Sequence, residues 1–280
     1  MRIFDLHCDA LSLAKNGEKE IEKCKEELKI GGVKKQCFAA YTANNSDKDE
    51  FLAQAKIFKE FSNEKELQAL LTVENAGFTM GDTAEIDELY KMGVRLLSLT
   101  HNGENKLAYP CSENKDIHLK GLKPSGVTAV EYMDSIGITL DVSHLNMGGF
   151  YDVSRICKRP IIASHSNCNT IYRHPRNLYD SQLRIIGRSG GVVGICFYSL
   201  FLNGTDSMSA DDIVRQAKHI ANIAGIDAVA LGSDFYGMEN KVGINSPAQY
   251  GQIIQKLGES FTADECDKIC YKNAERIFTC

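Results

Sequence analysis

The feature that most constrains the fold is a regular alternation of short apolar runs and longer helical patterns along all 280 residues. Eight runs rich in β-forming residues recur, and a segment with helical periodicity follows each of them. Several runs are apolar almost throughout, which is typical of parallel strands buried on both faces. We expect strands at Ile3–Cys8, Cys37–Thr42, Ala69–Val73, Arg95–Thr100, Thr139–Ser143, Ile161–Ser164, Val192–Phe197 and Ala228–Gly232.

The intervening segments have the apolar spacing of amphipathic helices. We expect helices at Glu18–Leu28, Asp47–Glu60, Thr83–Met92, Val127–Ile136, Gly149–Cys157, Ser181–Arg188, Ala210–Ala224 and Pro247–Leu257, and a last helix that begins at the capping box Thr262-Ala263-Asp264-Glu265 and reaches Phe278. Because no linker-like stretch interrupts the alternation, we predict an α/β protein with a single (β/α)₈ TIM-type barrel domain over residues 1–280. A doubly wound open sheet is the alternative. It would need a Gly-rich first turn, which Leu6-His7-Cys8-Asp9-Ala10 lacks.

Polar residues that can bind metals lie at the carboxyl ends of the expected strands. His7 and Asp9 end the first strand and are expected to share one face of it, since side chains alternate along a strand. Later strands end in further residues of this kind, namely Glu74, His101, His144, His165 and Asp234. The active site of a TIM-type barrel is built at this edge.

A single His after an apolar strand is usually a hydrogen-bonded structural residue. Four of them beside three carboxylates favour a metal site at the C-terminal ends of the strands. Three His, one Asp and one Glu provide two sets of three ligands if Glu74 is shared by two ions. Nitrogen and oxygen ligands without thiolates suit Zn²⁺, with Mn²⁺ or Co²⁺ as alternatives. We therefore expect two divalent metal ions and a hydrolase.

The composition argues against several kinds of partner. A net charge of −5 and mixed charges leave no basic stripe for nucleic acid. No apolar run approaches the roughly 18 residues that would cross a membrane. The ten cysteines are spread over a large domain and are typical of reduced, buried thiols. Since the ligand-bearing strand already reaches His7, we expect no signal peptide and a cytoplasmic location.

Seven segments in this order and spacing resemble the membrane (renal) dipeptidase family of dinuclear zinc peptidases, in particular its short bacterial members. The segments are Asp5–Asp9, Glu74–Gly77, Gly93–Asn102, Leu140–His144, Ser164–Ser166, Arg176-Asn177 and Gly232–Phe235. The resemblance covers nearly the whole chain. It implies the same barrel fold and a metal centre in which one zinc ion is bound by His7 and Asp9, the other by His144 and His165, and both by Glu74.

The resemblance also implies roles in catalysis and substrate binding. His101 would contact the substrate near the scissile carbonyl, and Asp234 would carry the proton from the attacking water to the leaving amine. Arg176 would pair with the dipeptide carboxylate, and Tyr198 would line the pocket. Each residue also has a structural interpretation: Arg176 as a surface residue, Asp234 as a helix N-cap, and Tyr198 as an aromatic residue of the barrel rim.

The resulting hypothesis is hydrolysis of small dipeptides by a hydroxide that bridges two metal ions. A barrel amidohydrolase acting on another small amide, lactone or ester is one alternative. Such enzymes often bridge their metals with a modified Lys on the fourth strand, and Arg95–His101 contains no Lys. A catalytically silent metal-binding barrel is the other. The sequence leaves open whether a D-residue is accepted at the second position and whether the protein is a monomer or a homodimer.

Overall fold

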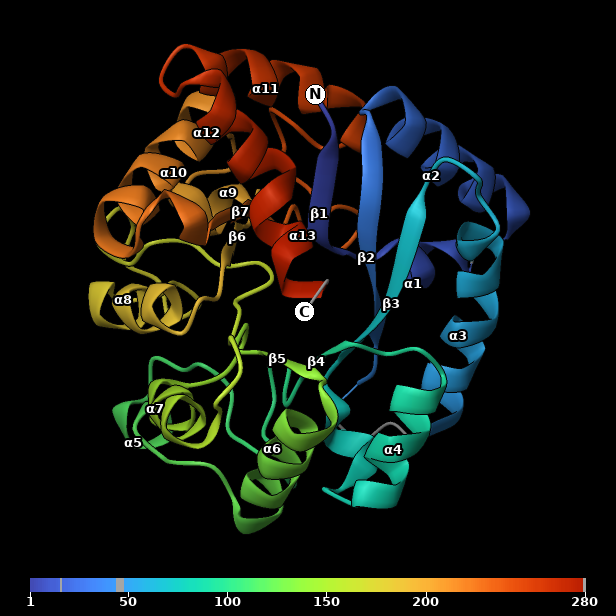
Figure 1. Cartoon of the computed structure of the whole chain (residues 1–280), viewed down its shortest axis with the longest axis vertical. Coiled ribbons are helices and arrows are strands. Elements are labelled where there is room, and N and C mark those ends of the chain that lie inside the picture. Colours follow the sequence, from blue (N-terminus) through green and yellow to red (C-terminus); the bar gives the residue numbers. More distant parts are fainter. Residues whose placement is uncertain (16, 44–47, 279–280) are drawn as a thin grey trace.

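A curled sheet of seven parallel strands organises the protein, and helices cover its outside (Figure 1). The computed structural model describes residues 1–15, 17–43 and 48–278. The strand order is β5-β4-β3-β2-β1-β7-β6. The strands are β1 (Ile3–Cys8), β2 (Val33–Tyr41), β3 (Gln68–Glu74), β4 (Leu96–Ser98), β5 (Thr139–Asp141), β6 (Val193–Ile195) and β7 (Val229–Leu231).

The segment expected as the sixth strand, Ile161–Ser164, is not a regular strand but forms bridges to both edge strands of the sheet. Val142 N donates to Ile162 O at 2.8 Å on the β5 side. Gly194 N donates to Ala163 O at 2.8 Å on the β6 side. The segment therefore lies between the two edges of the curled sheet.

Several strands are shorter than the sequence predicts. The expected fifth strand ran to Ser143, whereas β5 ends at Asp141. The physical reason is local, because the carboxylate of Asp141 accepts the backbone N–H of Ser143 at 2.9 Å and turns the chain out of the ladder. Polar side chains at strand ends can hydrogen-bond to backbone groups, which are then not available for hydrogen bonds between strands.

The helices agree closely with the expected positions. The α-helices are α1 (Ala10–Ala14), α2 (Glu18–Ile30), α3 (Lys48–Ser62), α4 (Thr83–Lys91), α5 (Lys115–His118), α6 (Pro124–Ile136), α7 (Met147–Ile156), α8 (Asp180–Arg188), α9 (Ser199–Leu202), α10 (Ala210–Ala224), α11 (Tyr250–Gly258), α12 (Ala263–Asp267) and α13 (Asn273–Phe278). Short 3₁₀ turns are η1 (Ala76–Thr79), η2 (Ile226–Ala228) and η3 (Pro247–Gln249). The short helices α1, α5 and α9 were not predicted, and the expected first residue of α3, Asp47, lies outside the described residues.

The predicted capping box of the last helix is confirmed. Thr262 Oγ1 accepts from Glu265 N at 3.4 Å, and the Glu265 carboxylate accepts from Thr262 N at 2.8 Å. The continuous helix expected from there to Phe278 is instead interrupted by a π-helical turn, η4 (Lys268–Lys272). This turn places Tyr271 against the interior of the sheet.

The apolar core has two parts because the strands are buried on both faces, as the sequence predicts. One part lies between the sheet and the surrounding helices. The other fills the inside of the curl, where Phe4, Leu6 and Leu96 meet Tyr271 and Ile277 from the end of the chain. Figure 1 shows α13 lying beside β1. The inner core thus packs against the strands inside the curl, and polar side chains occupy the carboxyl ends of the strands.

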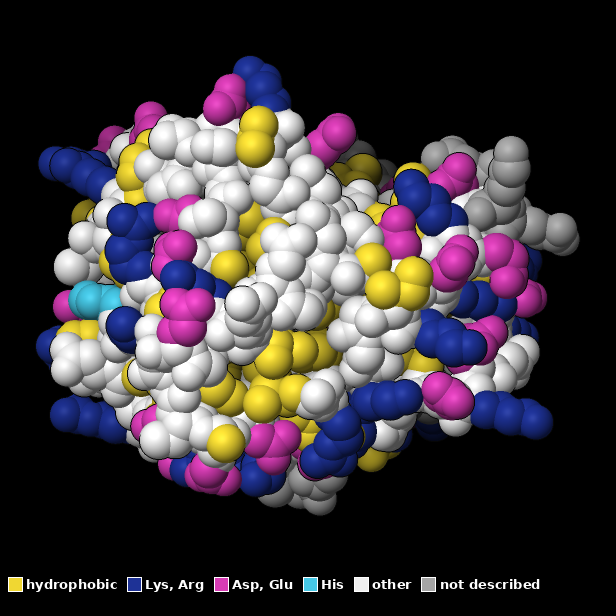
Figure 2. All heavy atoms as spheres, turned by 90° about the horizontal axis from the view of Figure 1, so that it is seen from above, with side chains coloured by type: hydrophobic (Ala, Val, Ile, Leu, Met, Phe, Trp, Pro, Cys, Tyr) yellow, Lys and Arg dark blue, Asp and Glu magenta, His cyan; other side chains and the backbone are white. Residues whose placement is uncertain are grey.

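The surface carries both signs of charge. Figure 2 shows basic and acidic side chains interspersed on the described part of one face, with some apolar side chains between them. Among the described residues, no helix combines the length and the apolar character that crossing a membrane requires.

Candidate metal centre

The candidate site lies where the carboxyl ends of the strands meet. His7 is the penultimate residue of β1 and Glu74 is the last residue of β3. His101, His144 and Asp234 follow β4, β5 and β7 after only a few residues. Because all strands are parallel, these ends share one edge of the curled sheet, and the side chains converge on one point.

The carboxylate of Glu74 lies at the centre of this cluster. Its Oε1 atom is 3.1 Å from His144 Nε2, 3.6 Å from His165 Nε2 and 3.9 Å from His7 Nε2. The Glu74 side chain is buried, with 5% of the residue exposed. One oxygen atom therefore faces three imidazole nitrogens from three different segments of the chain.

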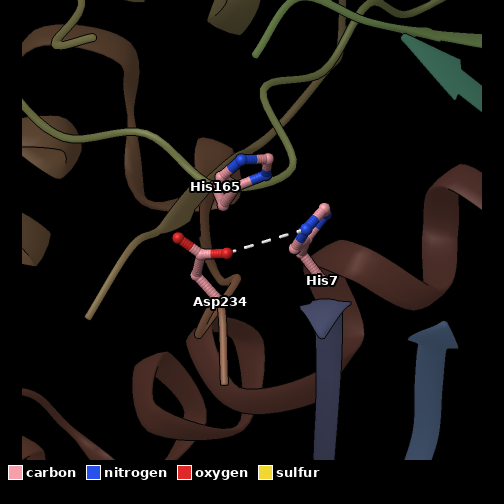
Figure 3. A group of neighbouring side chains, drawn as sticks. All are labelled: His7, His165 and Asp234. Atoms are coloured by element: carbon pink, nitrogen blue, oxygen red, sulfur yellow. Dashed lines mark ion pairs between the residues drawn. The ribbon is translucent and has the colours of Figure 1, made fainter. Parts of the chain in front are cut away.

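The other side of the cluster is formed around His7. Its Nε2 atom lies 3.5 Å from Asp9 Oδ2 and 3.7 Å from Asp234 Oδ1. Figure 3 shows His7 at the end of β1 pointing towards Asp234, with His165 beside both. The pairing of β1 with β2 shifts register between Asp5 and Cys8, and Asp9 follows the end of the strand, yet His7 and Asp9 point to the same site.

The nitrogens of the cluster have the orientation that a cation requires. His144 Nδ1 contacts Asn102 Oδ1 at 2.9 Å and His165 Nδ1 contacts Ser164 Oγ at 2.8 Å, so an outer partner faces each Nδ1. The two Nε2 atoms then face each other at 2.9 Å. His7 Nε2 is buried and has no hydrogen-bond partner among the described residues. Converging imidazole lone pairs beside carboxylates fit a divalent metal ion.

Three overlapping groups can each supply three ligand atoms that lie within 4.8 Å of one another. The groups are His7 with Asp9 and Glu74, His7 with His165 and Asp234, and Glu74 with His101 and His144. Glu74 and His7 each belong to two of them. His7 and Glu74 thus link the three groups, and His101 lies near enough to be counted with the ligands.

Burial and neighbouring charges shift the pKa values of several side chains in the cluster. Burial lowers the pKa of His7, but the carboxylates of Glu74 and Asp9 outweigh burial and raise it to about 10. Burial raises the pKa of Glu74 to about 8 and that of Asp234 to about 7, although the charge on His7 opposes both shifts. Several buried carboxyl groups crowd here, and a bound dication would relieve their repulsion.

The backbone at the site is unusual. His144 has a φ of 65° and Asp234 a φ of 67°, in the left-handed region that residues other than glycine rarely adopt. Asn75, directly after Glu74, has a φ of 72°. Such conformations cost roughly 1–3 kcal/mol each and gather at functional sites. At these strand ends they turn ligand-type side chains into the site.

A cavity of about 540 Å³ opens above the cluster. The sequence-predicted residues Asp9, Glu74, His101, His144, Tyr198 and Asp234 line it. Tyr198 directly precedes α9, beyond the end of β6. Sequence reasoning missed the neighbouring Ser12, Tyr41, Asn102 and Tyr236, which also line the cavity. Tyr41 is the last residue of β2, so its position at a strand end was a usable signal.

His101 and Arg176 lie at different depths. The His101 ring packs against His144 at 4.3 Å and Tyr41 at 4.8 Å between centroids, and burial together with the charge of Arg176 lowers its pKa to about 4. Arg176 is only 6% exposed and does not belong to the residues that line the cavity. It donates to His165 O at 3.1 Å, and its Nε has no hydrogen-bond partner among the described residues.

A curled parallel sheet that gathers imidazoles and carboxylates at its strand ends is the architecture of metal-dependent enzymes with a TIM-like fold. The sequence agrees with this class. Residues 42–280 match the sequence profile of the membrane dipeptidases, peptidase family M19. The chain therefore belongs to the membrane dipeptidase family, which consists of metallopeptidases, as the sequence motifs predicted.

Two curated relatives are 32% identical to this chain. The match to an uncharacterized dipeptidase of Schizosaccharomyces pombe spans 207 residues, which is 72% of this chain but 50% of the yeast protein. The chain therefore spans about half the length of that relative. The match to an uncharacterized Klebsiella pneumoniae protein encoded in the region 5′ of pqqA spans 225 residues, 76% of this chain and 82% of that protein.

The fold also agrees with a solved structure. A metallopeptidase from Rhodobacter sphaeroides, liganded with a phosphinate mimic of the dipeptide L-Ala-D-Ala, superposes with a TM-score of 0.87. The match covers 99% of this chain and 98% of that one at 21% identity. At this identity the likeness establishes the fold alone.

Proposed function

We propose that this protein is a metal-dependent dipeptidase that hydrolyses the peptide bond of small dipeptides. The observation that carries the proposal is the position of Glu74 Oε1 within 3.9 Å of three imidazole nitrogens. One of them, the buried His7 Nε2, has no hydrogen-bond partner among the described residues. Such a cluster on the wall of a 540 Å³ cavity suits activation of a water molecule next to a small substrate.

We assign the cofactor as two divalent ions, most simply Zn²⁺, which nitrogen and carboxylate ligands suit. His7 and Asp9 would hold one ion, His144 and His165 the other, and Glu74 would be shared. When bound, the ions supply an acidified water molecule and polarise the scissile carbonyl.

Asp234 and His101 are proposed to act on the substrate. Asp234 lines the cavity beside His7, so its carboxylate can accept a proton from the attacking water and deliver it to the leaving amine. His101 is neutral near pH 7, since its pKa is lowered to about 4 by burial and by the charge of Arg176. A neutral imidazole keeps one N–H, which can donate to the oxyanion.

Arg176 is proposed to bind the carboxylate of the dipeptide. Its buried cation has an Nε without a hydrogen-bond partner in the described part of the chain, and a bidentate guanidinium suits a carboxylate. A fixed carboxylate site close to the metal centre would limit the substrate to short peptides. The aromatic ring of Tyr198 on the cavity wall would contact the substrate side chains, with no preference for L- or D-residues assigned.

The remaining expectations belong to this proposal. We infer that Ile161–Ser164, sixth in chain order, completes the set of eight strands in one (β/α)₈ barrel over residues 1–280. Its hydrogen bonds to both edge strands support this. The nine cysteines that the structure describes are free thiols, which supports a reducing compartment such as the cytoplasm. The homodimer stays a prediction.

Metal analysis together with substrate hydrolysis tests the proposal. The purified protein is expected to hold two divalent ions per chain and to cleave members of a panel of L-L and L-D dipeptides. The Asp234→Asn variant is the matched control, because it should keep the metal while losing turnover. A protein that binds less than one ion and cleaves no dipeptide would contradict the proposal. Turnover of lactones or esters alone would favour the amidohydrolase alternative.

A further inference from the structure

We propose that Asp141 and Ser164 form a hydrogen-bonded relay that fixes the imidazole of His165 in the one tautomer able to bind a metal. Both are positioning residues that act through His165. The inference rests on the proposed metal-dependent function and deepens it, since it says what controls metal affinity in one half of the centre.

The relay is a short chain of buried polar contacts. Ser164 Oγ donates to Asp141 Oδ2, and the same oxygen lies 2.8 Å from His165 Nδ1. Asp141 is 5% exposed, Ser164 0% and His165 1%. Water therefore has little access to these contacts, and each polar atom depends on its protein partner.

The direction of every hydrogen bond in the relay follows from counting protons. Asp141 Oδ1 already accepts from Ser143 N and Ser164 N, both at 2.9 Å. Ser164 Oγ donates to Asp141 Oδ2, and a carboxylate only accepts, so the Ser164 proton points towards Asp141. Ser164 Oγ must then accept from His165 Nδ1–H. This leaves the lone pair on His165 Nε2, which faces Glu74 Oε1 at 3.6 Å.

The backbone around the relay is also held in place. Ser143 Oγ accepts from His165 N at 3.1 Å. The Ser164 carbonyl is packed so closely between two strands that a Cβ on Gly194 or Gly232 would come within 1.9 Å and 1.7 Å of its oxygen. Neither glycine can therefore be replaced without moving the relay. The ring of His165 is fixed through both its backbone and its Nδ1 atom.

A second buried Asp–Ser pair, Asp5 with Ser233, lies near the end of β1 and serves as a control for the relay. The buried carboxylate of Asp5 accepts from Ser233 N at 2.9 Å, from Ser233 Oγ at 2.6 Å and from His7 N at 3.2 Å. Ser233 Oγ also accepts from Phe235 N at 3.2 Å and lies 3.3 Å from the backbone oxygen of His7. Among the described residues, this Asp–Ser pair contacts no imidazole nitrogen. It resembles the Asp141–Ser164 pair in burial and in its hydrogen bond from Ser to Asp, but its other partners are backbone groups and the Tyr250 hydroxyl.

Zinc titration of three variants tests the relay. Metal-free wild type, Ser164→Ala, Asp141→Asn and Ser233→Ala are titrated with Zn²⁺ in competition with a chromogenic chelator. Loss of a partner that orients a ligand His costs about 10–100-fold in metal affinity. We expect a loss of this size for one of the two ions in Ser164→Ala and a smaller loss for the same ion in Asp141→Asn. Ser233→Ala should bind both ions as the wild type does.

The tautomer gives a second readout that does not depend on metal or turnover. In ¹⁵N NMR spectra of the metal-free protein labelled at histidine, His165 is expected to carry its proton on Nδ1 in the wild type. Ser164→Ala should shift it to a mixture of tautomers, and Ser233→Ala should not. If Ser164→Ala does not fold, the same two measurements on Asp141→Asn decide the question.

The outcomes separate the relay from the proposed function. A wild type that binds no zinc defeats the proposed function, while the tautomer of His165 still tests the relay. A wild type that binds two ions, with Ser164→Ala unchanged in affinity and tautomer, overturns the relay alone. An equal loss of affinity in Ser164→Ala and Ser233→Ala also overturns it, because both changes would then act only through stability.

Discussion

Replacing Glu74 by glutamine should change the melting temperature of the zinc-loaded protein but hardly that of the metal-free protein. The Glu74→Gln change keeps the side-chain volume at a position that is 5% exposed. Burial raises the pKa of Glu74 to about 8, so the metal-free wild type carries this carboxyl mostly protonated at pH 7. An amide of the same shape then replaces a neutral group, and we expect little change in the melting temperature of the metal-free protein.

The metal-loaded protein should behave differently. Two unit charges about 4 Å apart attract each other by about 4 kcal/mol at an effective dielectric constant near 20. The ion is divalent, so loss of the Glu74 charge should weaken binding by at least a thousandfold. Zinc at about 1,000 times the dissociation constant stabilises a protein by about 4 kcal/mol, which corresponds to roughly 8 °C in melting temperature for a chain of this size. Glu74→Gln should lose most of that increment.

Differential scanning calorimetry of both proteins, metal-free and with zinc at one fixed concentration, measures the effect. Asp141→Asn provides a second carboxyl-to-amide change beside the centre, and its smaller effect on zinc binding should leave much of the increment. If Glu74→Gln keeps the full zinc-dependent rise in melting temperature, Glu74 does not bind the metal and the central assignment of the site is wrong.

Three further predictions follow from the site. Arg176→Ala should chiefly raise KM for dipeptides, because the buried guanidinium is proposed to bind the substrate carboxylate in both ground and transition states. Steady-state kinetics with equal losses in kcat would argue against this. Asp234→Asn should lower kcat by about 10²–10⁴-fold at near-normal KM, and a kcat within tenfold of the wild type would exclude its proton role. Zinc uptake near pH 7 should release protons, since the raised pKa values of the coupled His7–Glu74 pair (about 10 and about 8) leave this pair holding at least one proton in the metal-free protein. Apparent zinc affinity should therefore rise from pH 6 to pH 8, and calorimetry in two buffers of different ionisation enthalpy measures the protons released.

The sequence predicted much of the fold because the main signals are local. Apolar runs such as Ile3–Cys8 are buried on both faces in the structure, and the helix Ala210–Ala224 begins and ends as expected. The capping box at Thr262 is formed as predicted. A buried strand and an N-cap are each specified by a few neighbouring residues, so both can be predicted from the sequence without knowledge of tertiary contacts.

Other features depended on competing interactions that a linear pattern does not contain. The early end of β5 comes from a side-chain carboxylate that captures the backbone of Ser143. The π-helical turn Lys268–Lys272 interrupts a segment with ordinary helical periodicity. Tyr236 and Asn102 reach the cavity from loops whose conformation the sequence did not predict. Loop geometry is decided by the elements on either side, not by the loop residues alone.

The sequence by itself determined the family, the parallel α/β architecture and which side chains stand at strand ends, since these follow from residue order and spacing. Only the tertiary structure decided how those side chains meet. Three imidazole nitrogens face one oxygen of Glu74, although the residues lie on segments from His7 to His165. The pairing of Asp141 with Ser164, 23 positions apart, likewise depends on the parallel bridge that joins the segment 161–164 to β5. Distances and hydrogen-bond directions are set by the register between strands, and register is a property of the folded sheet.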